Sequence, residues 1–413
     1  MTSLASMNDG TVISARTARA LFPLEAGTTY LNHGTVGVTP WPVLRHRAAL
    51  LEEIEKHPAR FMLRELMRLD ASTSANVLPG TLRLRAATAR VATFLGATAD
   101  DLVFVDNATA GVNAVLRSID LEPGSEILVH DHAYGGVARA TARIAAERGW
   151  TVAPLVLPGA DADDAAYVAA VERAVGPRTR LALLDHVSSE TALVMPLAAM
   201  AAVCRSRGVA VLVDGAHAPG AVDLDLGALD VDWYVANLHK WAFAPRSCGI
   251  LWAAPGRRAR LQPPVLSWGS SSDDWVAAFE WTGTRDPTPW LSAPAGLDFI
   301  DDALGGPRAL REHNHDLAWR SAHFLAERWN VPFSTPESRV GSMVRVPLPP
   351  PFDRGDDADA QRLRDRLFFE HRIEVPVLAR GGRLRVRMSL QVYNDAADVE
   401  RLAAAVEGLT RAG

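Results

Sequence analysis

Lysine is rare in this chain, because 41 of its 43 basic residues are arginines and only Lys56 and Lys240 are lysines. Arginine stays protonated in proteins, whereas a lysine withdrawn from water can lose its proton and attack a carbonyl group. Lys240 follows the mostly apolar run 231–236 and the polar residues Asn237 and His239. Its place after a predicted buried strand indicates a Schiff-base lysine. Lys56 lies among glutamates near the end of a predicted helix, which indicates a solvated position.

Polar residues also follow four other predicted strands. Ligands of open α/β sheets bind at the carboxyl ends of the strands, so side chains at these positions are expected to gather at one edge of the sheet. The polar runs are Asp106–Thr109, Asp131–Tyr134, Ser188–Thr191 and Asp214–His217. Together with the lysine they predict a ligand site rather than a part of the hydrophobic core.

Each of these residues has a structural and a functional interpretation. Asn107 and Thr109 either cap a helix or, with the N–H groups of the small residues up to Gly111, bind a phosphate. Asp214 either belongs to a turn or meets a cation such as a protonated pyridine nitrogen, because a buried carboxylate is costly without one. His132 is either structural or lies flat on an aromatic ligand. Pyridoxal 5′-phosphate (PLP) requires N–H groups for its phosphate, a carboxylate for its ring nitrogen and a lysine that reacts with its aldehyde, and the functional interpretations supply all three. PLP stabilises a carbanion at the substrate's α carbon.

The elements that would position these residues alternate between helix and strand. Apolar strands separated by helices indicate a mostly parallel sheet covered on both faces, which is an α/β fold. Residues 262–294 are rich in Pro, Ser and Trp and predict a long loop with a functional or interface role. A smaller α/β domain is expected after Pro294. The predicted strands are 101–105, 126–130, 151–157, 180–187, 209–213, 231–236 and 248–252, with 343–347 and 383–388 in the smaller domain.

Composition narrows the class of protein. At 413 residues the chain is long enough for two domains, and its net charge of −5 argues against a nucleic-acid binder. Cys204 and Cys248 form neither a disulfide framework nor a metal-binding pattern, so we expect no metal and a reducing compartment. No secretory signal or membrane span is apparent, so we expect a cytoplasmic protein without membrane partners.

Seven segments in order along the chain carry a resemblance to a known family. The chain resembles the fold-type I PLP-dependent enzymes of the class V aminotransferase group, and most closely their isopenicillin N epimerase-like branch. This resemblance implies an aspartate aminotransferase-like fold, with an arm over residues 1–35 that packs on the small domain, a large PLP-binding domain over 36–290 and a small domain over 291–413. The segments are Asn32–Gly37, Asn107–Asn113, Val213–Gly220, His239–Trp241, Ser267–Gly269, Glu280–Pro287 and Arg387–Asn394.

The resemblance also implies a role for individual residues. Lys240 would bind the cofactor covalently and move the α proton, Asp214 would pair with the ring nitrogen, and His132 would stack on the ring, with Tyr134 as the alternative. Lys240, Asp214 and His132 are the implied catalytic residues. Arg387 would hold the substrate carboxylate, and Thr284 would reach the phosphate of a partner subunit in a homodimer with shared active sites. Further cofactor contacts would come from Ala108, Thr109, His217, Asn237 and His239, and further substrate contacts from Asn32, His33 and Tyr134.

The reaction is left open among several alternatives. Every one begins with removal of an α proton by Lys240. An epimerase then needs an acid on the second face, for which His217, His132 and Tyr134 are available, whereas an eliminating lyase needs only a leaving group. We expect epimerisation or elimination on an amino-acid derivative, in amino-acid or secondary metabolism, with transamination as the alternative and a non-catalytic PLP-binding regulator as a minor one. A persulfide-forming desulfurase is not expected, because the loop predicted at 376–382 has no cysteine.

Overall fold

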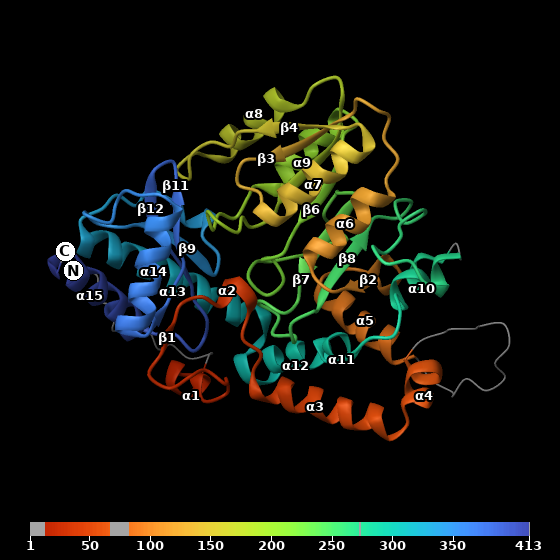
Figure 1. The fold of residues 1–413 in the computed structure, drawn as a ribbon, viewed down its shortest axis with the longest axis horizontal. Helices are drawn as coiled ribbons and strands as arrows, with labels where there is room; N and C mark the ends of the chain where they lie inside the picture. The colour runs from red at the N-terminus through yellow and green to blue at the C-terminus, as the bar shows by residue number, and fades with distance from the viewer. Residues whose placement is uncertain (1–12, 67–81, 272–273, 413) are drawn as a thin grey trace.

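The computed structural model describes residues 13–66, 82–271 and 274–412, and its centre is a seven-stranded sheet (Figure 1). The strand order is β2-β8-β7-β6-β5-β3-β4, and β8 alone runs antiparallel to its two neighbours. The expected α/β fold with a mostly parallel sheet is therefore confirmed. The strands are β2 (Leu102–Val105), β3 (Glu126–His130), β4 (Thr151–Leu155), β5 (Thr179–Asp185), β6 (Ala210–Asp214), β7 (Trp233–Asn237) and β8 (Gly249–Ala253).

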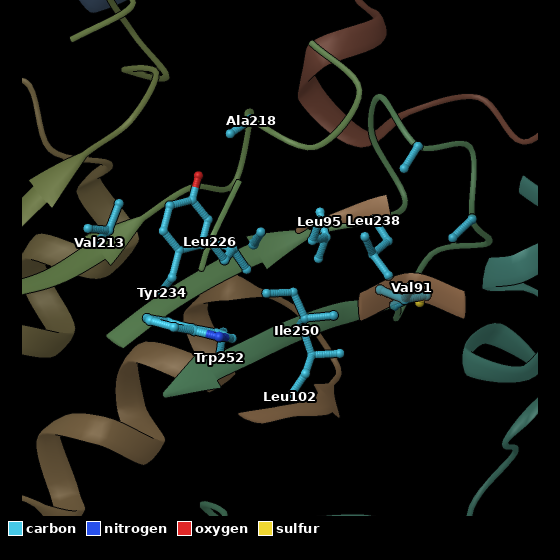
Figure 2. Packing of buried hydrophobic residues seen from close by; sticks show 14 of the residues in the cluster. Val91, Leu95, Leu102, Val213, Ala218, Leu226, Tyr234, Leu238, Ile250 and Trp252 are labelled. Carbon is cyan, nitrogen blue, oxygen red and sulfur yellow. The ribbon is translucent and has the colours of Figure 1, made fainter. Parts of the chain in front are cut away.

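Alternate residues of these strands enter two different hydrophobic clusters, as expected for a sheet covered on both faces. One cluster joins the strands to α6, α7 and α10, and the other joins them to α5, α8, α9 and α12. Figure 2 shows the second cluster, in which Ile250 lies near Leu95 and Tyr234 lies near Val213 and Leu226. The helices are α5 (Arg83–Phe94), α6 (Ala108–Ser118), α7 (Gly135–Arg148), α8 (Asp164–Ala174), α9 (Leu197–Ser206), α10 (Trp275–Glu280) and α12 (Ala293–Leu304).

A third cluster of buried apolar residues lies in the C-terminal part of the chain. It is built on the antiparallel sheet β11-β12-β9 and on the helices α13, α14 and α15. The N-terminal strand β1 joins this part by pairing in parallel with β10. The elements are β1 (Thr29–Tyr30), β9 (Met343–Pro347), β10 (Ile373–Glu374), β11 (Val377–Arg380), β12 (Arg383–Ser389), α13 (Gly306–Trp329), α14 (Asp357–His371) and α15 (Ala396–Ala412).

The prediction of a long loop over residues 262–294 is wrong. The described part of this segment contains short helices, and Trp275 and Trp290 are buried in them. Helix α12 follows directly, and its apolar residues belong to the large-domain core although the expected domain boundary lies at residue 290. The short elements of this segment are η3 (Trp268–Ser271) and α11 (Thr288–Leu291) besides α10. Near the N-terminus lie the 16-residue α3 (Trp41–Lys56) and the short α1 (Ala15–Arg19), α2 (His33–Val36), α4 (Pro58–Arg60) and η1 (Phe61–Glu65).

Two further expectations concern the N-terminal arm and the absence of membrane-spanning helices. Residues 1–12 of the expected N-terminal arm lie outside the described residues. Within 13–66, 82–271 and 274–412, every helix is too short or too polar to cross a membrane.

Candidate active site

Lys240 lies three residues beyond the end of β7 and is buried, with 9% of its surface exposed. Its Nζ lies 3.0 Å from Nε2 of His217. Burial lowers the pKa of Lys240 to about 7, although the nearby Asp214 carboxylate acts in the opposite direction. A substantial fraction of the amine is therefore neutral at neutral pH, which is the form that attacks a carbonyl group.

A tight contact with α2 fixes the backbone around this lysine. Gly37 ends α2 with φ +71°, and a Cβ atom there would lie 1.8 Å from the carbonyl oxygen of His239. His33 is completely buried, with Nε2 2.9 Å from the Lys240 carbonyl oxygen and Nδ1 2.9 Å from the hydroxyl of Tyr393. Both ring nitrogens are thus occupied by the protein. The expectation that His33 contacts the substrate is corrected: its contacts position the lysine loop.

Asp214 ends β6 and lies beside Asp185 of the neighbouring strand. Burial, together with the charge of Asp185, raises the pKa of the Asp214 carboxyl to about 7. Its Oδ1 accepts a hydrogen bond from the N–H of Ala216 at 3.0 Å. No cationic side chain of the described residues forms an ion pair with it. A protonated ring nitrogen would supply the missing charge. Asp185 was missed in the sequence because it lies inside the predicted strand 180–187, whereas the structure ends β5 at this residue.

The N-terminus of the eleven-residue helix α6 forms a third part of the site. Asn107 caps the helix by accepting from the N–H of Ala110 at 3.0 Å, and Asn237 accepts from the N–H of Ala108 at 2.9 Å. The direct phosphate contact expected of Ala108 is therefore corrected, because its donor is used within the protein. The N–H of Thr109 has no hydrogen-bond partner in the described part of the chain, and it remains available to an anion.

Two further groups stand near this helix terminus. His239 contacts the carbonyl oxygen of Cys248 through Nδ1 at 3.0 Å, which leaves Nε2 for a ligand. Arg246 and Ser247 line the same cavity. The sequence prediction missed Arg246, because an arginine in an irregular segment of an arginine-rich chain carries no distinguishing signal.

Arg387 approaches the site from β12 of the small sheet. Its Nη1 donates to the carbonyl oxygen of Ser189 at 2.5 Å and its Nη2 to Oγ1 of Thr35 at 2.9 Å, while Nε has no partner. Burial lowers the pKa of Arg387 to about 10, so it stays charged at neutral pH. No carboxylate of the described residues lies within ion-pair distance, which leaves this guanidinium free to hold a substrate carboxylate.

A cavity of about 1120 Å³ joins these groups. His132 is buried beside it, with Nδ1 3.0 Å from Oγ1 of Thr191, but does not line it. Thr284 is exposed and lies outside it. The predicted residues that line the cavity are Asn32, Ala108, Thr109, Tyr134, Asp214, His217, Asn237, His239, Lys240 and Arg387.

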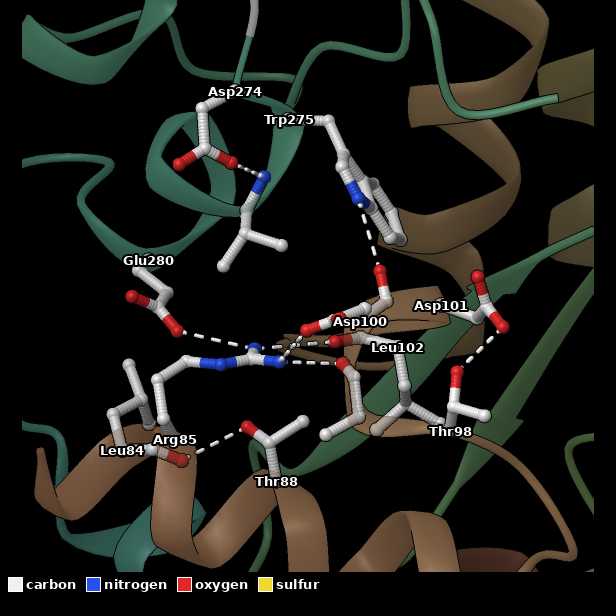
Figure 3. A network of polar contacts seen from close by, with 12 residues as sticks. Leu84, Arg85, Thr88, Thr98, Asp100, Asp101, Leu102, Asp274, Trp275 and Glu280 are labelled. Atoms are coloured by element: carbon white, nitrogen blue, oxygen red, sulfur yellow. Dashed lines mark hydrogen bonds and ion pairs between the residues drawn. The ribbon is translucent and has the colours of Figure 1, made fainter. Parts of the chain in front are cut away.

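The segment that leads to Thr284 is anchored by a polar network (Figure 3). Arg85 of α5 donates to Oε1 of Glu280 at 3.2 Å and also contacts the carbonyl oxygens of Ala99 and Leu102. Burial raises the pKa of Glu280 to about 7, and Arg85 acts against this rise. The glutamate that opens the 280–287 motif therefore ties α10 to α5 and β2, away from Lys240.

Neither cysteine is placed for nucleophilic chemistry. Cys204 and Cys248 are buried, and burial raises the pKa of both thiols, that of Cys204 to about 11. Residues 376–382 were expected to be a loop, but they contain β11.

This architecture is that of the fold-type I PLP-dependent enzymes, and the chain belongs to the class V aminotransferase family. The family model described as aminotransferase class-V matches residues 79–359. Isopenicillin N epimerase from Streptomyces clavuligerus is 34% identical over 410 residues, covering 95% of this chain and 98% of that protein. Putative L-cysteine desulfhydrase 1 from Oryza sativa subsp. japonica is 32% identical, covering 97% and 87%.

A solved structure supports the fold assignment. A mutant of C-DES with glycine covalently linked to the PLP cofactor has a TM-score of 0.74 and 24% identity, and the match covers 94% of this chain and 98% of that one. Membership of the family indicates PLP as the cofactor of this chain. The donor set fits it, since the site offers a buried lysine, an unpaired carboxylate and a free helix N–H. The chain is thus a PLP-dependent enzyme of the isomerase or lyase type.

Proposed function

We propose that this enzyme removes the α proton of an amino-acid derivative and returns a proton to the opposite face, which makes it an epimerase. The observation that carries the proposal is that one cavity is lined both by the buried Lys240 and by Arg387, which has no carboxylate of the described residues within ion-pair distance. Arg387 would hold the substrate carboxylate and so present the α carbon to the lysine amine. The relationship to isopenicillin N epimerases over nearly the whole chain favours this outcome.

Lys240 Nζ would take the α proton. His217, whose Nδ1 accepts from the indole N–H of Trp241 at 3.4 Å, would orient the lysine amine through Nε2 at 3.0 Å. When bound, PLP supplies the electron sink that stabilises the resulting carbanion. Asp214 would hold the proton on the ring nitrogen, and Thr109, His239 and Arg246 would hold the phosphate. Tyr134 lines the cavity and is about half exposed, which makes it our choice for the acid on the second face. His132 is buried beside the cavity, next to the lining residue Ala133, and from there it would stack on the cofactor ring.

A C–S lyase is the second candidate function. It is favoured by the similarity to L-cysteine desulfhydrases, and it requires only Lys240 and a leaving group on the β carbon. The buried state of Cys204 and Cys248 argues against a mechanism that stores sulfur on the enzyme.

We further propose a cytoplasmic homodimer that works in secondary metabolism. Thr284 is exposed and outside the cavity of its own chain, which suits a contact with the phosphate site of a partner subunit. Val265 and Leu266 are 59% and 68% exposed, and adjacent exposed apolar residues are typical of an interface.

An assay in deuterium oxide with a panel of amino acids tests the reaction. Inverted product with deuterium at the α carbon is the expected result. A keto acid with ammonia would establish elimination instead, and a keto acid that forms only with a second amino acceptor would establish transamination.

A further inference from the structure

We propose that Arg345 and Arg385 form a second anion-binding subsite beside Arg387, which receives a carboxylate at the far end of the substrate. This inference rests on the proposed function, because it adds a substrate class to the same active site. It is carried by the strand register, by the charge balance around these arginines and by their neighbours Leu378, Glu190 and Arg387, which line the cavity although Arg345 and Arg385 themselves do not.

The register places all three guanidinium groups on one face of the small sheet. Arg387 of β12 lies directly opposite Arg345 of β9, and Arg385 precedes Arg387 by two residues. Opposed residues of an antiparallel pair, and residues two apart on a strand, point to the same face. The alternate residues Leu384 and Val386 enter the small-domain core, so the arginines face the other way.

The neighbouring arginines of this face already have acidic partners. Arg380 pairs with Asp131 at 2.7 Å and lies 4.0 Å from Glu190. Arg383 pairs with Asp353 at 2.9 Å. Asp131 and Asp353 are therefore already paired with arginines beside the turn between β11 and β12.

Arg345 and Arg385, by contrast, have no ion pair or hydrogen bond from their side chains within the described ranges. Both are half-buried. Burial, followed by the charge of Arg385, lowers the pKa of Arg345 to about 10, and burial and the neighbouring arginines lower that of Arg385. Both side chains stay protonated at neutral pH, so two adjacent positive charges are partly withdrawn from water without an ion pair, although the charge of Glu190 acts on Arg345. Such an arrangement is costly unless an anion completes it.

This pair adjoins the cavity that holds Lys240. Leu378, the cross-strand partner of Arg385, lines the cavity, and so do Glu190 and Arg387. Glu190 stabilises the charged forms of both Arg345 and Arg387, which places all three groups in one neighbourhood. A ligand whose α-carboxylate is held by Arg387 can therefore extend along the sheet face towards the pair.

A guanidinium pair is suited to a carboxylate, because each fork can donate two parallel hydrogen bonds. An amino acid with a single carboxylate, such as cysteine, would leave the pair unmatched. The substrate class that completes the charge balance is an amino-acid derivative with a second carboxylate.

The test uses PLP-loaded enzyme and a series of L-2-amino dicarboxylic acids of increasing length, each compared with its ω-amide. Exchange of the α proton in deuterium oxide gives kcat/KM for every compound. For the best chain length we expect the acid to exceed the amide by about tenfold or more. The ratio of kcat/KM for the acid to that for the amide should fall to about one in the double variant Arg345→Gln with Arg385→Gln. It should stay unchanged in the control Arg383→Gln. The single variant Arg385→Gln, at a half-buried position, should lower the ratio in part if the double variant does not fold.

Equal exchange of acids and amides by the wild type, or a ratio that survives in the folded variants, would overturn the subsite while the proposed function stands. Absence of exchange with every compound would instead reject the proposed function. In that case calorimetry with glutarate and longer dicarboxylates decides the subsite. Weaker binding to Arg385→Gln than to Arg383→Gln supports it, and equal binding overturns it.

Discussion

In the half of the cavity contributed by the large domain, polar groups already contact one another. Lys240 lies against His217, and Asn237 accepts from the helix N–H of Ala108. On the side of the small domain, Arg387 lines the cavity, and Arg345 and Arg385 share its sheet face; none of the three has an acidic partner in ion-pair contact within the described residues. The first half is preorganised for one cofactor, whereas the second, in our proposal, would be completed by the anionic groups of a ligand. Changes in the first half should therefore affect every substrate, and changes in the second should select among them.

The strongest test of the large-domain half is Lys240→Ala. Loss of the only buried lysine amine should abolish the visible absorbance of the lysine-bound cofactor and lower kcat by about 10⁴-fold for every substrate. Absorbance spectra and steady-state rates measure both effects, with Lys56→Ala as the matched control. If the absorbance band persists in Lys240→Ala, the central assignment is wrong.

Asp214→Asn should have the next largest effect. An amide cannot balance a protonated ring nitrogen, so kcat should fall about 10²- to 10³-fold with all substrates alike. Rates for two dissimilar amino acids measure this uniformity, and the exposed Asp223→Asn serves as the control. A loss of kcat confined to one substrate would contradict the distinction between the large-domain half and the small-domain half of the cavity.

Arg387→Gln tests the small-domain half. Removal of a buried guanidinium that pairs with the substrate carboxylate should cost about 2–5 kcal/mol, seen mainly as a higher KM. The cofactor spectrum should stay that of the wild type, because the cofactor contacts lie in the other half. Steady-state measurement of KM and kcat for Arg387→Gln and for the control Arg383→Gln separates the effect on substrate binding from the effect on turnover. An altered cofactor spectrum in Arg387→Gln would contradict the assignment of Arg387 to the substrate.

The smallest expected effect is on pH dependence. Burial lowers the pKa of Lys240 to about 7, so the neutral amine is lost as pH falls below that value and is fully present above it. The rate at which PLP attaches to cofactor-free enzyme should therefore fall about tenfold per pH unit below 7 and level off above pH 8. Stopped-flow absorbance between pH 5.5 and 9 gives this profile. A rate that still rises steeply up to pH 10 would mean that the lysine keeps its ordinary pKa.

Much of the fold was predictable because its signals are local. Apolar runs separated by helical patterns gave the seven strands of the large sheet to within a few residues. The family resemblance, the PLP cofactor and the epimerase or lyase class also followed from the sequence and were confirmed by the comparisons. The segment 262–294 was misjudged, because helices of four to six residues are too short to show a helical period.

The sequence by itself determined which residues can do chemistry: a single lysine after a buried strand, a carboxylate at a strand end and a small-residue helix start. Only the tertiary structure decided which of them meet. It buried both nitrogens of His33 in protein contacts, and it brought Asp185 beside Asp214. It also set Arg345 opposite Arg387, 42 positions away along the chain. Local patterns specify the elements, but the register between strands is fixed by the packing of the core, which no short stretch of sequence contains.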